Sequence, residues 1–215
     1  MDSSYNKLLA GNRAWVARKQ AEDPEFFARL SRGQEPRYVW LGCSDSRIHA
    51  NEVTGTEAGE IFVHRNIANQ VFQTDMNLLA VLYYAVEILR VKHVLVVGHY
   101  GCGGIATAMK REDLGFVNNW LRGVKEVYAR HRDELDALSD DRREDRLAEL
   151  NVIEQVNNLT KTRILQRAWS NRELQLHGWV FDHRNGRITE LVNRDRFEGV
   201  DPLFAYESTM PATGA

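Results

Sequence analysis

Cysteine is scarce in this 215-residue sequence, which contains only Cys43 and Cys102. Two cysteines allow one disulfide, two unrelated buried thiols or two ligands of a shared metal site. A chain of this length buries roughly 70% of its unfolded surface, and 43% hydrophobic residues fill such a core without cross-links. Disulfides are therefore unnecessary for folding, and the reducing compartment expected below argues against one.

The sequence also lacks an excess of charge and a long hydrophobic run. Its 28 Lys and Arg residues nearly balance 30 Asp and Glu residues, which leaves no basic field to attract a nucleic acid. We expect no membrane span, since no run reaches the roughly 18 apolar residues that a span needs. The N-terminus lacks the basic start and apolar stretch of a signal peptide, so we predict a cytoplasmic protein.

Short apolar runs predict five strands, at 38–41, 61–63, 93–97, 174–181 and 187–192. The run at 93–97 is β-branched and apolar, as expected for a central parallel strand that is covered on both faces. The Asn185-Gly186 pair between the last two strands indicates a hairpin. The last strand should therefore be antiparallel to its neighbour.

Apolar residues at helical spacing predict helices at about 4–19, 77–89, 116–138 and 142–169, with short helices after Pro24 and from Gly103. Asp23 and Thr74 are the predicted N-caps. The fold class is therefore α/β, with a mainly parallel central sheet, an antiparallel edge strand and flanking helices. We expect a single domain over 1–200, in which 1–35 form an N-terminal helical arm, and a poorly ordered tail over 201–215.

Two polar clusters follow apolar strands of the predicted sheet. The first contains Cys43, Asp45 and Arg47, and the second contains His99 and Cys102. Taken singly, a cysteine or a histidine beside a strand is more often a packing residue. Because ligands bind at the carboxyl ends of parallel strands, however, the two clusters should converge. Two thiolates, an imidazole and the Asp45 carboxylate form a suitable ligand set for tetrahedral zinc.

The sequences of these two clusters, Cys-Ser-Asp-Ser-Arg at 43–47 and His-Tyr-Gly-Cys-Gly-Gly at 99–104, resemble the zinc signature of the β-class carbonic anhydrases. The resemblance extends over about residues 5–195, through 62–69, 118–120, 149–155 and 177–179. It implies a zinc enzyme that interconverts carbon dioxide and bicarbonate, with Cys43, His99 and Cys102 holding one zinc ion per subunit. It also implies a homodimer embraced by the amphipathic N-terminal arm and commonly paired into a homotetramer.

The resemblance also implies that Asp45 and Arg47 act as a switch. Asp45 on zinc closes the site against water, whereas a bidentate hydrogen bond from Arg47 competes for the carboxylate and opens the site. In the open state zinc lowers the pKa of its bound water and presents hydroxide to carbon dioxide, while Asp45 accepts the hydrogen bond of the hydroxide. Gly103, at a helix start, and Ile48 are the expected substrate contacts.

Three further residues suggest an allosteric bicarbonate site. Family members that bicarbonate inhibits, a type II-like bacterial subgroup, resemble this chain in having Trp40 and Arg65. Their third contact is a tyrosine, but Phe181 stands in its place and lacks the hydroxyl donor. For Trp40 and Phe181, plain core packing is the alternative interpretation.

Other departures from the family follow the zinc motif. His49, Thr56 and Ala58 stand where many relatives have Pro, Leu and Pro, respectively. His49 is either a proton acceptor at the mouth of the site or an ordinary surface histidine. We expect Thr56 and Ala58 to change the rigidity of a loop rather than the chemistry.

Three alternatives to carbon dioxide hydration stay open. The same zinc site suits hydrolysis of carbonyl sulfide or carbon disulfide. The second alternative is a non-catalytic bicarbonate-sensing zinc protein in which Asp45 closes the site permanently. The presence of Arg47 argues against it, because such a protein does not need a residue that detaches Asp45 from the metal. A thiol redox protein is the weakest alternative, because Cys43 and Cys102 do not form a C-x-x-C pair.

Overall fold

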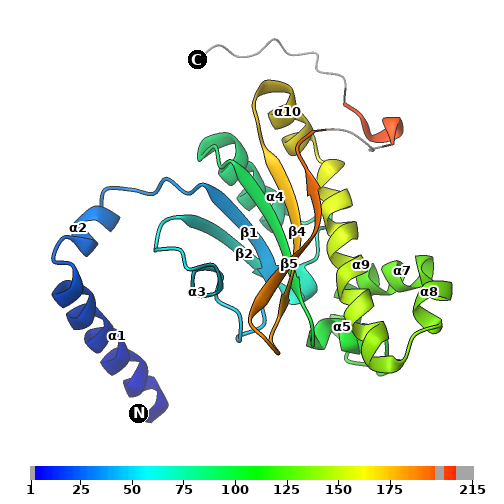
Figure 1. The fold of residues 1–215 in the computed structure, drawn as a ribbon, viewed down its shortest axis with the longest axis horizontal. Coiled ribbons are helices and arrows are strands. Elements are labelled where there is room, and N and C mark those ends of the chain that lie inside the picture. Colours follow the sequence, from blue (N-terminus) through cyan, green and yellow to red (C-terminus); the bar gives the residue numbers. More distant parts are fainter. Residues whose placement is uncertain (1–2, 197–200, 207–215) are drawn as a thin grey trace. The chain divides into compact units, whose positions relative to one another are not determined.

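A computed structural model describes residues 3–196 and 201–206 of the chain (Figure 1). It contains two compact units, Met1–Glu35 and Pro36–Ala215. In the first unit, α1 (Ser3–Glu22) is followed by α2 (Phe26–Leu30). Trp15 of α1 packs edge-on against Phe27 of α2, with ring centroids 5.4 Å apart.

One prediction about this first unit is wrong. The N-cap of α2 is Glu25, because Asp23 accepts a hydrogen bond from the Glu25 N–H (3.0 Å) and so closes a turn before the helix. Among the large apolar side chains of α1, Tyr5, Leu8 and Leu9 are exposed.

The second unit is built on a five-stranded sheet in the order β2-β1-β3-β4-β5. The strands are β1 (Tyr38–Cys43), β2 (Ile61–Asn66), β3 (His93–His99), β4 (Gln175–Asp182) and β5 (Arg187–Arg194). The first four are parallel, and β5 pairs with β4 in antiparallel register. Both the mainly parallel sheet and the hairpin therefore agree with the prediction.

Helices of this unit connect the strands and pack around the sheet (Figure 1). They are α3 (Ala50–Thr54), α4 (Met76–Tyr83), α5 (Gly103–Ala108), α6 (Phe116–Trp120), α7 (Arg122–Arg130), α8 (Arg132–Asp136), α9 (Asp140–Thr160) and α10 (Arg163–Asn171). A single turn, η1 (Ile67–Asn69), follows β2, η2 (Tyr84–Ile88) continues α4, and η3 (Pro202–Phe204) lies near the C-terminus.

Three helix predictions need correction. The N-cap of α4 is Asp75 rather than Thr74, because the Asp75 carboxylate accepts hydrogen bonds from the backbone of Asn77 and Leu78. The expected helix over 116–138 is divided into three at Leu121 and His131, where the backbone leaves helical geometry. The helix over 142–169 is divided at Thr162, whose hydroxyl accepts from Leu165 N–H and so caps a new helix.

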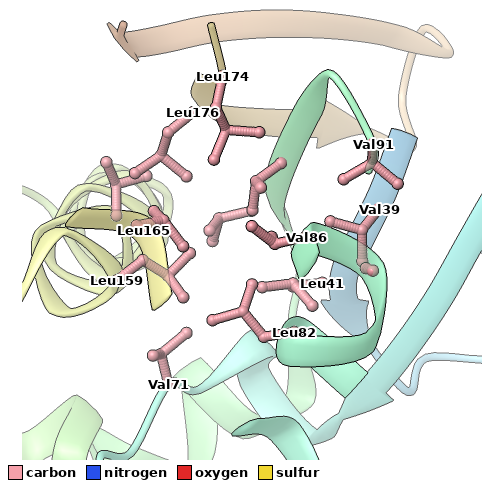
Figure 2. Close-up of a cluster of buried hydrophobic side chains, with 14 of the residues drawn as sticks. Val39, Leu41, Val71, Leu82, Val86, Val91, Leu159, Leu165, Leu174 and Leu176 are labelled. Atoms are coloured by element: carbon pink, nitrogen blue, oxygen red, sulfur yellow. The ribbon is translucent and has the colours of Figure 1, made fainter. Parts of the chain in front are cut away.

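The main core lies between one face of the sheet and α4, η2, α9 and α10 (Figure 2). Val39 and Leu41 of β1 face Leu82 of α4, while Leu176 of β4 faces Leu159 of α9. Helix α9 contacts β3 and β4, where the sheet has two glycines. A Cβ atom at Gly98 would lie 2.5 Å from Val152 Cγ2, and one at Gly178 would lie 3.0 Å from Val152 Cγ1. The glycines therefore allow α9 to approach the sheet closely.

Smaller clusters complete the unit. Trp40, Leu95, Val97 and Phe181 pack on the other face of the sheet, together with Ile48. A third cluster, which includes Ile105 and Leu121, surrounds Cys43 and Cys102. Within the described part of the chain, no helix has the length and apolar character that crossing a membrane requires.

Part of the expected disordered tail has a defined conformation. Gln166 of α10 donates a hydrogen bond to the Phe204 carbonyl (2.9 Å) and accepts one from the Tyr206 N–H (2.9 Å). Residues 207–215, the rest of that expected tail, lie outside the described residues.

Candidate metal centre

Three of the four predicted ligands meet at the carboxyl ends of two adjacent parallel strands. Cys43 is the last residue of β1, His99 is the last residue of β3, and Cys102 is the N-cap of α5. Their ligand atoms all lie within 4.8 Å of one another, and all three side chains are buried. The two sulfurs are 3.9 Å apart and belong to free thiols.

The orientation of His99 identifies its ligand atom. Its Nδ1 lies 3.0 Å from the Tyr100 carbonyl oxygen, which can only accept, so Nδ1 carries the proton. Nε2 then has a free lone pair. Among residues 3–196 and 201–206 this buried Nε2 has no hydrogen-bond partner, and it faces the two cysteines. An unprotonated, unpartnered nitrogen beside two sulfurs is suited to a metal ion.

The two thiols share one hydrogen bond, which makes them unequal. Donation from Cys102 is the largest cause that lowers the pKa of Cys43, to about 4, with backbone hydrogen bonds from Asp45 and Ala68 adding to the effect. The same donation, followed by burial, raises the pKa of Cys102. A buried thiolate next to a neutral imidazole leaves a negative charge that a cation would neutralise.

An unusual backbone segment supports Cys43 from the side of β2. Ala68 and Asn69 have φ values of 59° and 46°, a left-handed conformation that costs of order 1–3 kcal/mol per residue. The Ala68 carbonyl accepts hydrogen bonds from the buried amides of Gln70 (2.8 Å) and Asn151 (3.0 Å). These amides hold the strained turn, which directs the Ala68 N–H toward the Cys43 sulfur. Periodicity does not reveal this turn, because its cause lies in α9.

Asp45, the fourth predicted ligand, is paired with Arg47. Arg47 Nε donates to Oδ1 (2.9 Å), and Nη2 donates to Oδ2 (2.6 Å) and to the Gly101 carbonyl (3.1 Å). The hydrogen bonds from Arg47 are the largest cause that holds the pKa of Asp45 well below its usual range. Asp45 Oδ2 is nevertheless only 3.8 Å from His99 Nε2. The carboxylate therefore lies beside the ligand atoms while Arg47 holds it.

The predicted regulatory residues are divided between two places. Trp40 and Phe181 are buried together on one face of the sheet. Arg65 is bound to the metal loop instead, because Nε donates to the Cys43 carbonyl (2.8 Å) and Nη2 donates to the Asp45 carbonyl. The structure thus ties Arg65 to the backbone on which the ligands lie.

The other predicted residues lie between Ile48 and Ala58 and at the start of α5. Ile48 is buried, whereas Gly103 is the exposed first residue of α5. His49 and Ala58 are exposed, and Thr56 is hydrogen-bonded to Thr54 and Asn51. These contacts place Thr56 in the loop after α3, as expected.

One residue at the site was missed by sequence analysis. His183, just after β4, places Nε2 3.1 Å from His99 Nδ1. It also lines a cavity of about 350 Å³ together with Arg47, Gly101, Asp145 and Arg184. Burial is the largest cause that lowers the pKa of His183. The only available signal was strand register, since β4 pairs Phe181 with His99.

Comparison with known proteins identifies the family. Residues 38–188 match the family model described as carbonic anhydrase. The chain is 48% identical to a carbonic anhydrase of Emericella nidulans over 193 residues, which cover 89% of this chain and 85% of that protein. This chain belongs to the β-class carbonic anhydrase family. The predicted enzyme class, carbonic anhydrase, is thereby confirmed.

Solved structures agree in fold. A structure from a study of two tetrameric β-carbonic anhydrases of Sordaria macrospora has a TM-score of 0.88 at 40% identity, covering 90% of this chain and all of that one. A Coccomyxa β-carbonic anhydrase, solved with acetazolamide, has a TM-score of 0.87 at 34% identity, covering 91% of this chain and 90% of that one. The predicted α/β fold class is confirmed.

Proposed function

We propose that this chain catalyses the reversible hydration of carbon dioxide to bicarbonate and a proton, using one zinc ion per subunit. The observation that carries the proposal is the buried Cys43, His99 and Cys102 set, in which the unpartnered His99 Nε2 faces two sulfurs. Two sulfurs and one nitrogen fit zinc better than magnesium or calcium, and three protein ligands are typical of a catalytic site. Metal analysis of the purified protein tests the stoichiometry.

Zinc held by Cys43, His99 and Cys102 would supply Lewis acidity, which would lower the pKa of a water molecule to near neutrality. The residues of the protein then orient this water molecule and exclude bulk solvent. Asp45 is ionised, lies beside the ligand atoms, and accepts a hydrogen bond from an incoming water. Apolar side chains around Cys43 and Cys102 keep bulk solvent from the ligands. Gly103 and Ile48 stay the proposed substrate contacts.

A switch between Asp45 and Arg47 gates this chemistry in our proposal. The support is the bidentate pairing, which engages both carboxylate oxygens and holds Asp45 in place as an acceptor. Loss of that pairing frees Asp45 to become a fourth ligand, which closes the site. The alternatives, a hydrolase of carbonyl sulfide or carbon disulfide and a bicarbonate sensor closed by Asp45, have no observation that favours them.

Stopped-flow carbon dioxide hydration by zinc-loaded protein, from about pH 6.5 to 9, tests the activity. We expect the rate to rise with pH. Asp45→Asn keeps the shape of the side chain but loses its charge, so it should lose activity on the order of 10²-fold or more while zinc stays bound. Asp145→Asn is the matched control, because Asp145 lines the cavity next to Arg47 and pairs with Arg184 instead. Full activity in Asp45→Asn would refute the assignment.

We further propose that bicarbonate regulates this chain and that the chain belongs to the bacterial type II-like subgroup. It is supported by Trp40 and Arg65, and it is weakened by Phe181. Arg65 would have to leave the Cys43 and Asp45 carbonyls to bind an anion, which would loosen the metal loop. Titration of bicarbonate against the wild-type protein and Phe181→Tyr tests this regulation. If bicarbonate inhibits neither protein, the regulatory site is rejected.

We also propose a homodimer, with pairing of dimers into a tetramer. Exposed apolar side chains on the edge strand β2 and on α4 and η2 support it: Val63, Met76, Tyr83, Tyr84 and Ile88. The study of tetrameric relatives from Sordaria macrospora is consistent with it. Analytical ultracentrifugation measures the assembly.

We further propose a cytoplasmic location, which is supported by the two free thiols and is testable by cell fractionation.

A further inference from the structure

His183 lies outside the ligand set, yet it contacts the metal-binding imidazole from behind. The pairing of β3 with β4 sets His99 opposite Phe181, and the Tyr100 N–H donates to the Phe181 carbonyl (3.0 Å). The chain therefore turns out of β4 directly beside His99. His183 packs edge-on against both Phe181 and His99, with ring centroids 5.1 Å and 5.0 Å away.

The turn that carries His183 is held at its base by Asp182. The Asp182 carboxylate accepts hydrogen bonds from Arg184 N–H (2.9 Å) and from the Asn185 amide (3.0 Å). Its carbonyl accepts from Gly186 N–H (2.8 Å), and Gly186 has the positive φ of 71° that the turn needs. His183 is thus presented by a fixed turn rather than by a loose loop.

The protons of the two imidazoles can be assigned from geometry. The Tyr100 carbonyl requires the proton of His99 to lie on Nδ1. His99 Nδ1 lies 3.1 Å from His183 Nε2. Because Nδ1 carries the proton, His183 Nε2 must accept it, and the proton is shared with the Tyr100 carbonyl in a three-centre hydrogen bond. His183 therefore carries its own proton on Nδ1.

We propose that His183 is a positioning residue that holds the metal-binding imidazole of His99 by accepting a hydrogen bond from its Nδ1–H. This inference rests on zinc binding at the proposed site. An acceptor on the far nitrogen fixes the tautomer and orientation of a ligating histidine and makes it a stronger donor to the metal. The Tyr100 carbonyl is one such acceptor, and His183 is a second one, contributed by a different strand.

The test separates the acceptor from the ring. His183→Phe keeps an aromatic ring against Phe181 but has no acceptor, and His183→Gln restores an acceptor of similar reach. His131→Phe is the matched control, because His131 lies between α7 and α8 and pairs with Glu134 instead. Zinc affinity is measured by competition with a chromophoric chelator, and zinc loss is followed in excess chelator. The absorption bands of the cobalt-substituted protein report the ligand geometry.

We expect His183→Phe to weaken zinc binding by about 10- to 100-fold and to shift the cobalt bands, with His183→Gln returning most of the affinity. Affinity within about twofold of wild type in His183→Phe, or equal losses in the Phe and Gln variants, overturns the role. If His183→Phe does not fold, the ¹⁵N shift of His183 Nε2 in the zinc-loaded wild type decides: a protonated Nε2 overturns the proposal. Failure of the wild type to bind zinc refutes the proposed function itself.

Discussion

Removal of the Arg47 guanidinium is the most direct perturbation of the proposed gate. Arg47 donates two side-chain hydrogen bonds to Asp45, but its own side chain is 55% exposed, so solvent screens the pair. We therefore assign the pair about 1–3 kcal/mol rather than the full value of two buried charge-assisted bonds. That range corresponds to about a 5- to 150-fold preference for the Arg47-bound position of Asp45.

In Arg47→Ala this preference disappears, and Asp45 is free to compete for the fourth coordination position. We expect the turnover number near neutral pH to fall by a comparable factor and the active range to move to higher pH, where hydroxide competes better with a carboxylate. Arg47→Lys should lie between the two, because lysine cannot make the bidentate contact. Stopped-flow rates measured across the pH range, with X-ray absorption at the metal, report both effects.

Arg184→Ala is the control for this experiment. Arg184 lines the same cavity, but its ion pairs are with Asp145 and Asp182. Its loss should leave the pH profile in place. A uniform loss of rate in Arg47→Ala, with a pH profile parallel to that of the wild type, would refute the gate, because a competing ligand must act differently at different pH.

Two other predictions concern the fold around the site. Gly98→Ala should lower the free energy of unfolding by about 1–3 kcal/mol, because its Cβ would lie 2.5 Å from Val152 Cγ2. Val152→Ala should recover at least about 1 kcal/mol of that loss in a double-mutant cycle by urea unfolding at fixed protein concentration, and additive losses contradict the steric reasoning. Burial lowers the pKa of His64 below its usual value, so the unfolded chain binds more protons and stability should fall as pH drops below about 6.5. His64→Gln should reduce that fall in thermal melts, and an unchanged slope rejects His64 as its source.

The sheet was predictable because each strand is a short apolar run with a clear stop. The hairpin itself was predictable from Asn185-Gly186, although its loop spans four residues because Asp182 pairs with Arg187. The convergence of Cys43 with His99 followed from parallel strands that end at one edge. The helix boundaries were less predictable, because neighbouring residues compete for one role. Thr74 and Asp75 are both good caps, and only the path of the chain selects the carboxylate of Asp75.

The parts of the site that sequence analysis missed share one physical cause: they depend on contacts between segments far apart in the chain. His183 matters because β4 lies beside β3, and no spacing within residues 175–187 indicates a neighbour at His99. The left-handed turn at Ala68 likewise depends on Asn151, which is 83 positions away. A motif reports the ligands themselves, whereas their supports are chosen by tertiary packing.

Helix α9 links that packing to the metal site. Gly98 and Gly178 leave room for Val152, which fixes how deeply α9 lies on the sheet. The residue before Val152 is Asn151, whose amide donates to the Ala68 carbonyl on the turn beside Cys43. A helix displaced outward by one methyl group would carry this amide with it and weaken the support that α9 gives to the strained turn. The close approach of helix and sheet is therefore a condition for the geometry of the ligands, not merely for stability.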